Sequence, residues 1–426
     1  GTDAAEKGPV PFFPVLSSPF FPILLIALTC VEYLNRPLPL VSAPALTTQT
    51  GRWLARAEGP GPVVYLPLTR DYGNTPFMLQ TLEHGRPIVN GYSGQRPMFY
   101  SAVADALADF PSADALWTLD ELEVRFVVTN VAVDTEAWPL VERARVIDPT
   151  LGPSTRIYEL AESSELRARL GPVAVAPPPP PGPIPFEVGE RATYRVLWAG
   201  VGTSVPAGRA TFDVRSGATQ DQTPGVLPLA DGARYRFVVT AATAPWVARF
   251  FEARDRFTTW TDAALRPLLH ERHLREGRRA SDLLIHYEPE KQTATMLRPT
   301  PEGIEREIAF RVPEQVRDPL AVFFYVRTLT LGPGQRVRIP LTDMGRTMVL
   351  EVLGGSVESI DVQGKRVDAL RIDAGLDRRV DTREAPEIRV WLSRDARRLP
   401  LMAEVRAGFG ALRLELDSYT SGTINR

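Results

Sequence analysis

Two histidines separated by two residues, His270 and His273, are the first side chains whose types and spacing could support chemistry. Imidazole is a common zinc ligand, and a zinc site gathers three or four ligands around the ion. The surrounding sequence alternates as in a strand, however, and positions three apart on a strand point to opposite faces. Because Cys30 is the only cysteine and only His286 is available as a third ligand, we expect no metal site here.

The loop from His84 to Gly94 is a second candidate, because it contains half of a nucleophile elbow. That motif has the spacing G-x-S-x-G. Here Gln95 stands where the last glycine belongs, so the sequence does not indicate a serine hydrolase. The Asn-Gly and Ser-Gly pairs favour left-handed backbone conformations. We therefore predict a tight, specific loop built by His84, Asn90, Gly91, Tyr92, Ser93 and Gly94.

Arginines gather around Gly277, where we predict the tip of a hairpin: Arg272, Arg275, Arg278 and Arg279. Two interpretations stay open. The charges could serve only to discourage pairing between sheet edges. Alternatively, Arg275, Arg278 and Arg279 could contact an anionic head group, since guanidinium is a strong donor to phosphate.

No other group of side chains predicts a reaction. Asp255 and Asp262 flank Trp260 but lie seven positions apart on a predicted strand, and therefore on opposite faces. We expect Asp255 to pair with a neighbouring arginine. The sequence contains no glycine-rich phosphate loop, no Ser/His/Asp set and no aromatic–basic face for nucleic acid. We predict no catalytic residue, no cofactor and no metal.

The composition is that of a folded protein with two or three domains. The chain has 426 residues, of which 44% are hydrophobic and 23% charged, and its net charge of −2 provides no field to attract nucleic acid. Lys7, Lys291 and Lys365 are the only lysines, and the even scatter of arginines indicates a GC-rich genome rather than a binding surface. One cysteine excludes a disulfide framework, which is compatible with the cytoplasm or a Gram-negative envelope.

A proline run divides the chain into two parts of different character. Seven of the nine residues from 177 to 185 are proline, and neither a helix nor a sheet ladder passes through such a run. Polyproline II at ~3.1 Å per residue would give a semi-rigid spacer of roughly 25–30 Å. We assign residues 171–185 as a Pro-rich linker, although such runs also bind aromatic grooves.

Residues 1–36 contain a strongly apolar stretch, Phe12–Leu34. About 20 apolar residues span a bilayer, so we predict a membrane-embedded helix that tolerates three prolines near its start. A buried helix of a soluble protein is the alternative. A signal peptide fits poorly, because Lys7 is the only basic residue before the stretch. As the chain begins with Gly1, we expect a fragment or a processed product, and this segment could be the last span of a longer protein.

Residues 40–170 alternate between helical and strand patterns, which predicts a small α/β domain. The pattern predicts strands at 63–66, 124–129 and 156–160, and helices at 47–57, 76–83, 97–109, 113–122 and 134–143.

After the prolines the hydrophobic period changes to two. Alternating segments separated by glycine turns predict ten or more antiparallel strands over residues 186–420. One helix, Pro319–Arg327, follows the N-cap Asp318. A curved sheet or open barrel wrapped around that helix is the economical arrangement, with Trp198, Phe237, Trp391 and Leu401 pointing inward. The whole chain is thus predicted to be an α+β multidomain protein.

Two resemblances to known families accompany these patterns. Val64–Leu68, the His84–Gly94 loop and Val124–Val128 resemble the extracytoplasmic tail after the last span of mannosyltransferase-type membrane glycosyltransferases. The resemblance covers roughly residues 20–160. It implies an enzyme that uses polyprenyl-phosphate sugars and whose catalytic acidic residues lie in an early loop that this chain lacks.

The second resemblance covers residues 186–420. Phe186-x-Val188-Gly189-Glu190, Asp318–Leu331 and the segment from Trp391 to Pro400 resemble a family of bacterial periplasmic domains of unknown function, DUF3108. This resemblance implies a periplasmic location and a β-rich fold, without an assigned reaction.

These observations favour a non-catalytic, membrane-anchored protein with its bulk in the periplasm. It would bind or scaffold in the envelope, holding a lipid or other hydrophobic ligand in the curved sheet against Trp198, Phe237 and Trp391. The alternative is the C-terminal fragment of a glycosyltransferase fused to a β-rich accessory domain. A third hypothesis is a soluble cytoplasmic protein.

Overall fold

The protein is described here from a computed structural model. The structure describes Ile26, Thr29 and Val31, and the residues 47–92, 97, 99–173, 175–199, 204–218, 232–376, 387–407 and 410–422. The chain divides into two units, residues 1–46 and residues 47–426. The predicted membrane-embedded segment lies outside the described residues apart from three positions, so the architecture below is that of the second unit.

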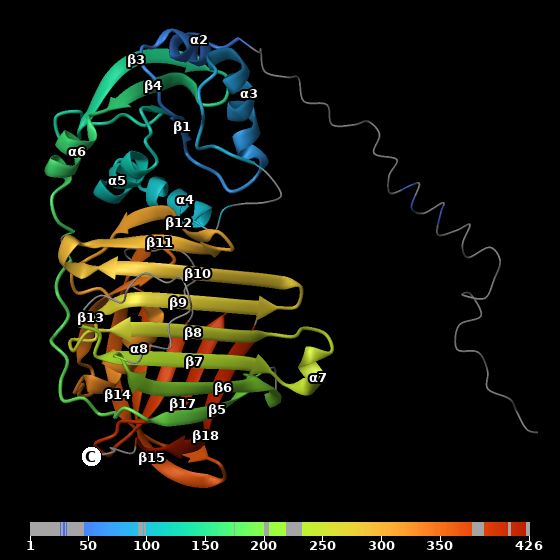
Figure 1. The fold of residues 1–426 in the computed structure, drawn as a ribbon, viewed down its shortest axis with the longest axis vertical. Coiled ribbons are helices and arrows are strands. Elements are labelled where there is room, and N and C mark those ends of the chain that lie inside the picture. Colours follow the sequence, from blue (N-terminus) through green and yellow to red (C-terminus); the bar gives the residue numbers. More distant parts are fainter. Residues whose placement is uncertain are drawn as a thin grey trace, which may run out of the picture. The chain divides into compact units, whose positions relative to one another are not determined.

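The first part of this unit is a four-stranded mixed sheet (Figure 1). Its strands are β1 (Val63–Leu66), β2 (Phe126–Thr129), β3 (Leu140–Asp148) and β4 (Gly152–Leu160). They lie in the order β1-β2-β4-β3, and only β1 and β2 are parallel. The two short parallel strands, β1 and β2, are buried at every position, as expected of strands covered on both faces.

Two helices of this part, α2 and α5, begin where the sequence provides caps. Thr48 and Ser112 each accept a hydrogen bond from a first-turn backbone N–H, of Gly51 and Ala115 respectively. The helices are α2 (Gln49–Arg56), α3 (Thr75–His84), α4 (Tyr100–Ala108), α5 (Ala113–Glu121) and α6 (Ser163–Leu170), with a 3₁₀ turn η1 (Tyr72–Asn74). The predicted α/β pattern is confirmed, and α6 is an addition to it.

The predicted helix from 134 to 143 is wrong, because strand β3 already begins at Leu140. Asp134 does accept backbone hydrogen bonds, from Glu136 and Ala137, but these form a local turn. Pro139 then interrupts any helix, and the following residues alternate in burial along β3. A capping residue predicted the right local hydrogen bonds and the wrong element.

The second part is one antiparallel sheet of fourteen strands. Its first eight strands are β5 (Arg191–Ala199), β6 (Ser204–Ser216), β7 (Tyr235–Thr243), β8 (Arg254–Thr261), β9 (Pro267–Glu276), β10 (Arg279–Glu288), β11 (Thr293–Thr300) and β12 (Gly303–Arg311). The remaining six are β13 (Arg336–Asp343), β14 (Arg346–Val362), β15 (Lys365–Leu376), β16 (Glu387–Ser393), β17 (Pro400–Ala407) and β18 (Gly410–Thr420). A 3₁₀ turn, η2 (Pro289–Lys291), joins β10 to β11.

The strands run as a meander whose first and last members meet. Across the sheet, the strands lie in descending order from β12 to β5 and then in descending order from β18 to β13. Strand β5 therefore pairs with β18, along nearly its whole length. The sheet curves around helix α8 (Pro319–Thr328) and stays open between β12 and β13 (Figure 1). The predicted curved sheet with a helix inside it is confirmed. A second, four-residue helix, α7 (Pro245–Ala248), lies in the β7–β8 connection.

Helix α8 packs on the concave side of the sheet. Phe324 stacks on Phe237 of β7 with ring centroids 3.9 Å apart, and Phe186 packs edge-on against both rings. Val352 and Ile372 close the same cluster from the opposite wall. A helix that is apolar around most of its circumference is stable only when it is enclosed in this way.

The two sheets share a core. Leu116 and Leu119 of α5 belong to the same buried cluster as Ile285, Met296 and Phe310 from β10–β12. Ion pairs border this contact, Arg306 with Glu121 and Arg311 with Asp114. The α/β part therefore packs directly on the strands that form one edge of the large sheet.

The proline run is also packed rather than free. Tyr325 of α8 donates a hydrogen bond to the carbonyl of Pro179, and Ile184 packs on the α8 cluster. A side chain at Gly182 would come within 2.4 Å of the carbonyl oxygen of Thr328. The predicted spacer is thus an extended strap laid against α8.

A buried ion pair holds α8 at its C-terminal end. Arg327 Nη1 lies 2.6 Å from Glu190 Oε1, and the two side chains are only 2% and 4% exposed. Arg327 Nη2 donates to the carbonyl of Arg397, and Tyr419 donates to Glu190 Oε2. One pair therefore links α8, the entry to β5, the β16–β17 loop and β18.

Replacing Glu190 with Gln should lower the free energy of unfolding by about 3–5 kcal/mol, because Arg327 is left as an uncompensated buried charge. The double replacement Glu190→Leu/Arg327→Met should recover much of this loss, since neither charge remains. Denaturant unfolding of the full chain, followed by tryptophan fluorescence, measures the free energy of unfolding of the single and the double variant.

The exposed pair Arg209–Asp417 provides the control, with side chains 66% and 31% exposed. Arg209→Ala should cost less than about 1 kcal/mol. An equal loss in Glu190→Gln and Arg209→Ala would contradict the role assigned to the buried pair.

Candidate functional site

The predicted His84–Gly94 loop is a structural element of the α/β sheet. The Asn90 side chain accepts from the Tyr65 backbone N–H and donates to the Tyr65 carbonyl, both at 2.7 Å, and so pairs with β1 as a neighbouring strand would. Asn74 Nδ2 donates to the Gly91 carbonyl at 3.0 Å. Tyr92 is 45% exposed. Ser93 and Gly94 lie outside the described residues.

His84 ends a buried chain of hydrogen bonds. Its Nδ1 accepts from the Arg86 backbone N–H at 3.0 Å, so the neutral ring carries its proton on Nε2, which lies 3.3 Å from Tyr65 Oη. Tyr65 donates in turn to Gln80, which donates to Asp148. Burial, and secondarily the charge of Arg86, lower the pKa of His84 to about 4. Burial raises the pKa of the Tyr65 hydroxyl. This network positions β1 and α3 and offers no nucleophile.

The two histidines of the H-x-x-H pattern contact different partners. His273 Nδ1 lies 2.8 Å from Asp282 on β10 and its Nε2 lies 3.8 Å from Glu271, and hydrogen bonding to these carboxylates raises the pKa of His273. His270 instead lies beside Thr259 and Asp318. Within the described ranges, no three His, Cys, Asp or Glu side chains gather in a way that could hold a metal ion.

Thr259, His270 and Asp318 form a hydroxyl–imidazole–carboxylate group that the sequence analysis missed. Thr259 donates to Asp318 Oδ2 at 2.7 Å, and His270 Nδ1 lies 2.9 Å from Thr259 Oγ1 and 3.2 Å from the same carboxylate oxygen. In a nucleophilic triad, the base uses one nitrogen for the hydroxyl and the other for the carboxylate. Here one nitrogen meets both, and Asp318 Oδ1 caps α8 at Ala321. Because all three residues are buried, the group anchors the helix.

The predicted ligand contacts are distributed over several environments. Phe237 is fully buried against α8, and Trp391 donates from Nε1 to Glu358 within a second cluster that also contains Leu401. Trp198 is 44% exposed, so it does not point into the core as predicted. At the hairpin tip, Arg275 forms two hydrogen bonds to Asp282.

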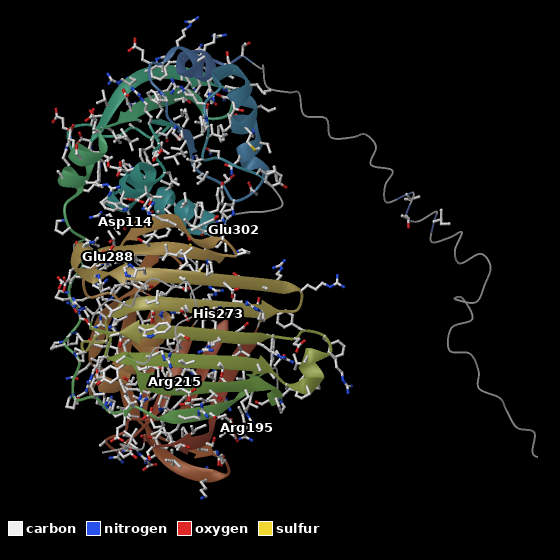
Figure 2. The ribbon with its side chains drawn as sticks, viewed as in Figure 1. Asp114, Arg195, Arg215, His273, Glu288 and Glu302 are labelled. Carbon is white, nitrogen blue, oxygen red and sulfur yellow. The ribbon has the colours of Figure 1, made fainter. Side chains whose placement is uncertain are left out.

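Arg278 and Arg279 lie at the same tip, exposed, and make no ion pair with any part of the chain that the structure describes. Figure 2 shows His273 on the strand that leads to this tip. The nearby carboxylate of Asp255 accepts from the backbone N–H of Arg275, rather than from an arginine side chain as predicted.

A polar pocket lined by described residues has a volume of about 750 Å³ and lies beside α5 and α6. Its charges are mostly paired within the protein: Arg167 lies 2.6 Å from Asp120 and 2.9 Å from Glu121, and Arg306 also contacts Glu121. Its walls therefore leave few groups to recognise a ligand.

An apolar lining on the concave side of the large sheet is the better candidate. Phe212, Val239 and Phe257 are directly paired across β6, β7 and β8, and Phe212 contacts Phe323 of α8 at 4.9 Å between ring centroids. The opposite wall adds half-buried residues that pack on the same cluster: Val337, Met348, Leu370 and Val390. We call the seven strand residues, without Phe323, the concave lining: Phe212, Val239, Phe257, Val337, Met348, Leu370 and Val390. The alternating pattern indicated such a face, but not which residues α8 would leave partly uncovered.

Among the residues that the structure describes, no helix is long and apolar enough to cross a membrane.

Comparison with known proteins gives a family for the second part of the chain. The family described as "Protein of unknown function (DUF3108)" matches residues 193–417, more than half of the sequence. No curated protein matches the chain. The resemblance of residues 20–160 to a glycosyltransferase tail therefore has no support from these comparisons.

Several solved structures are similar at low identity. A β-barrel-like protein of domain DUF1849 from Brucella abortus is 12% identical, covering 56% of this chain and 99% of that one, with a TM-score of 0.38. A putative exported protein with a YmcC-like fold from Bacteroides fragilis is 10% identical, covering 56% and 98%, with a TM-score of 0.21. The lipoprotein LppX from Mycobacterium tuberculosis is 10% identical, covering 55% and 88%, with a TM-score of 0.16. Similarity at this level does not identify a ligand or an activity.

The pKa values of His84 and His273 should be shifted in opposite directions from that of a free histidine. By NMR, His84 should titrate near pH 4 and His273 above the usual value of about 6.5. Because the unfolded chain binds the His84 proton first, the free energy of unfolding should fall as the pH drops from about 6.5 to about 4. His84→Gln should flatten this part of the profile. The contribution of His273 has the opposite sign and is lost as the pH rises through its folded pKa. A His84 titration near 6.5 would show that the buried network is absent.

Proposed function

The chain belongs to the DUF3108 family of proteins of unknown function, and from this premise we propose that it is a non-catalytic binding protein of the bacterial envelope. Its bulk would lie outside the cytoplasm, and the concave lining would hold an apolar ligand such as a lipid chain. The proposal builds on the periplasmic association that the family resemblance implies and on the apolar character of the lining.

The observation that carries this proposal is the half-buried state of the lining. Apolar side chains in a protein core are normally enclosed, whereas these seven residues face α8 and are still partly uncovered on both walls of the sheet. A contiguous apolar surface that remains accessible favours contact with an apolar group. The ladder of Phe212, Val239 and Phe257 would offer such a group a smooth wall.

A role without catalysis is supported by the use of the polar groups. Asp318, His270 and Thr259 bind one another and cap α8, and Glu190 is neutralised by Arg327. These groups lie where substrate has no access, and each has a structural partner. Among the described residues, the concave lining itself offers apolar contact.

Ligand binding is tested with a fluorescent fatty-acid probe and with native mass spectrometry of the full chain purified from envelopes. The wild-type protein should enhance the probe's emission and retain co-purifying lipid. Phe257→Gln and Val390→Gln, on the two walls, should each weaken probe binding by roughly fivefold or more, because each loses part of an apolar contact.

Val141→Gln is the matched control, since Val141 is an apolar residue on β3 that is 46% exposed and lies in the other sheet. It should leave probe binding unchanged. If the wild-type protein neither binds the probe nor retains lipid, the ligand part of the proposal is wrong.

The location is tested separately. Alkaline phosphatase is active only outside the cytoplasm, so its fusion to the C-terminal end of the full chain, expressed from the natural gene, should be active. The matching β-galactosidase fusion should be inactive. The reverse pattern would show a cytoplasmic protein and would remove the envelope from the proposal.

A further inference from the structure

One end of the large sheet carries exposed aromatic side chains that no part of the proposed binding function uses. Figure 1 shows α7 projecting from the ends of β7 and β8. Phe250 is 87% exposed, Phe251 50% and Trp246 48%, and Trp198 and Val205 on the neighbouring β5–β6 hairpin are 44% and 40% exposed. We call these five residues the aromatic tip.

The backbone beneath the aromatic tip is well ordered by hydrogen bonds. Trp246 Nε1 donates to the carbonyl of Pro206 at 2.7 Å, which joins α7 to β6. The backbone N–H groups of Phe250 and Phe251 both donate to the Val247 carbonyl at 2.9 Å. The loop therefore has its own structure, and it directs its largest apolar side chains outward. Exposed apolar groups held in this way indicate an interaction site.

Uncompensated arginines surround the aromatic tip. The β9–β10 hairpin lies next to it, because Gly277 N–H donates to the Glu252 carbonyl at 2.7 Å and Ala253 bridges Glu276. Arg249, Arg278 and Arg279 are exposed and form no ion pair with the described parts of the chain. Over residues 244–256 and 274–282, six arginines stand against four carboxylates. This end of the sheet therefore combines the apolar side chains of the aromatic tip with a positive charge around them.

This combination selects among the possible occupants. A second copy of the same tip would bring like charges together, which disfavours a symmetric dimer. A membrane surface with anionic lipids matches both features, since aromatic rings settle at the level of the head groups and basic side chains are attracted to their phosphates. The convex, projecting shape of the loop also suits insertion into a soft surface.

We propose that the aromatic tip docks on an anionic phospholipid surface, with Trp246, Phe250 and Phe251 in the head-group region and Arg249, Arg278 and Arg279 against the phosphates. This site goes beyond the proposed function, because it shares no residue with the concave lining. In the membrane-bound state the end of the sheet that carries α7 would face the bilayer.

The test places an environment-sensitive NBD label at the tip of the full chain. Cys30→Ser removes the only cysteine, and Phe250→Cys then allows labelling at one site. A local probe is needed because the apolar segment at residues 12–34 could bring any form of the chain to vesicles. The matched control is Leu82→Cys, at a residue of α3 that is 75% exposed. Far-UV circular dichroism confirms that each labelled chain is folded.

Vesicles of phosphatidylcholine with phosphatidylglycerol should shift the emission at position 250 to shorter wavelength and leave that at position 82 unchanged. Vesicles of phosphatidylcholine alone should give a much smaller shift. In the Arg278→Gln/Arg279→Gln background, the binding constant of the tip for anionic vesicles should fall by roughly 20- to 30-fold, because each basic residue near an anionic surface contributes about a factor of five.

An unchanged emission at position 250, or equal shifts at positions 250 and 82, would overturn the proposal. Equal shifts with neutral and anionic vesicles would overturn the assigned role of the arginines. If vesicles have no effect but polyglutamate shifts the emission at position 250, the partner is an acidic protein surface and the membrane assignment is wrong. None of these outcomes depends on ligand binding in the concave lining.

Discussion

The buried pair between Arg327 and Glu190 is the interaction on which the β-rich part depends. Its charges lie among Phe186 and Phe324, where an isolated ion would be strongly disfavoured. Each therefore requires the other, together with the Arg397 carbonyl and the Tyr419 hydroxyl. Such a pair adds little net stability over an apolar packing, but it strongly penalises any arrangement that separates its members. It specifies one position for α8 relative to the seam between β5 and β18.

The other end of α8 is fixed by the same principle with different groups. Asp318 caps the helix and binds Thr259 and His270 on the sheet, while Arg317 is buried beside Tyr325 and donates to the carbonyl of Ala264. Burial lowers the pKa of the Arg317 guanidinium. A ten-residue helix is thus joined to the sheet by charged side chains at both ends. Its apolar middle needs only to fill space, and this explains why the lining around it can remain partly open.

Local pattern predicted the elements, and distant pairing decided the rest. Alternation identified the β-rich part, and Asp318-Pro319 located α8, because both signals reside in neighbouring residues. Thr259, His270 and Asp318 come from separate segments, so no spacing rule could have grouped them. The aromatic tip was missed for another reason: a mostly apolar stretch such as Trp246 to Phe251, with Arg249 as its only charge, is equally typical of a buried strand. Trp198 was wrongly predicted to point into the core, because alternation indicates which side chains share a face of a strand but not whether that face is covered at each position.

The pairing of the first strand with the last has a consequence for biosynthesis. While the chain is being made, β5 gains β6 as a neighbour at once, but its other edge stays unpaired until β18 has been synthesised, some two hundred residues later. At roughly 5–20 residues per second, this interval lasts on the order of 10–40 s. During that time the β5 edge is a template for pairing with other chains. A chain of this topology is therefore most vulnerable to aggregation just before its last strand is complete, and it would benefit from a chaperone that covers the β5 edge.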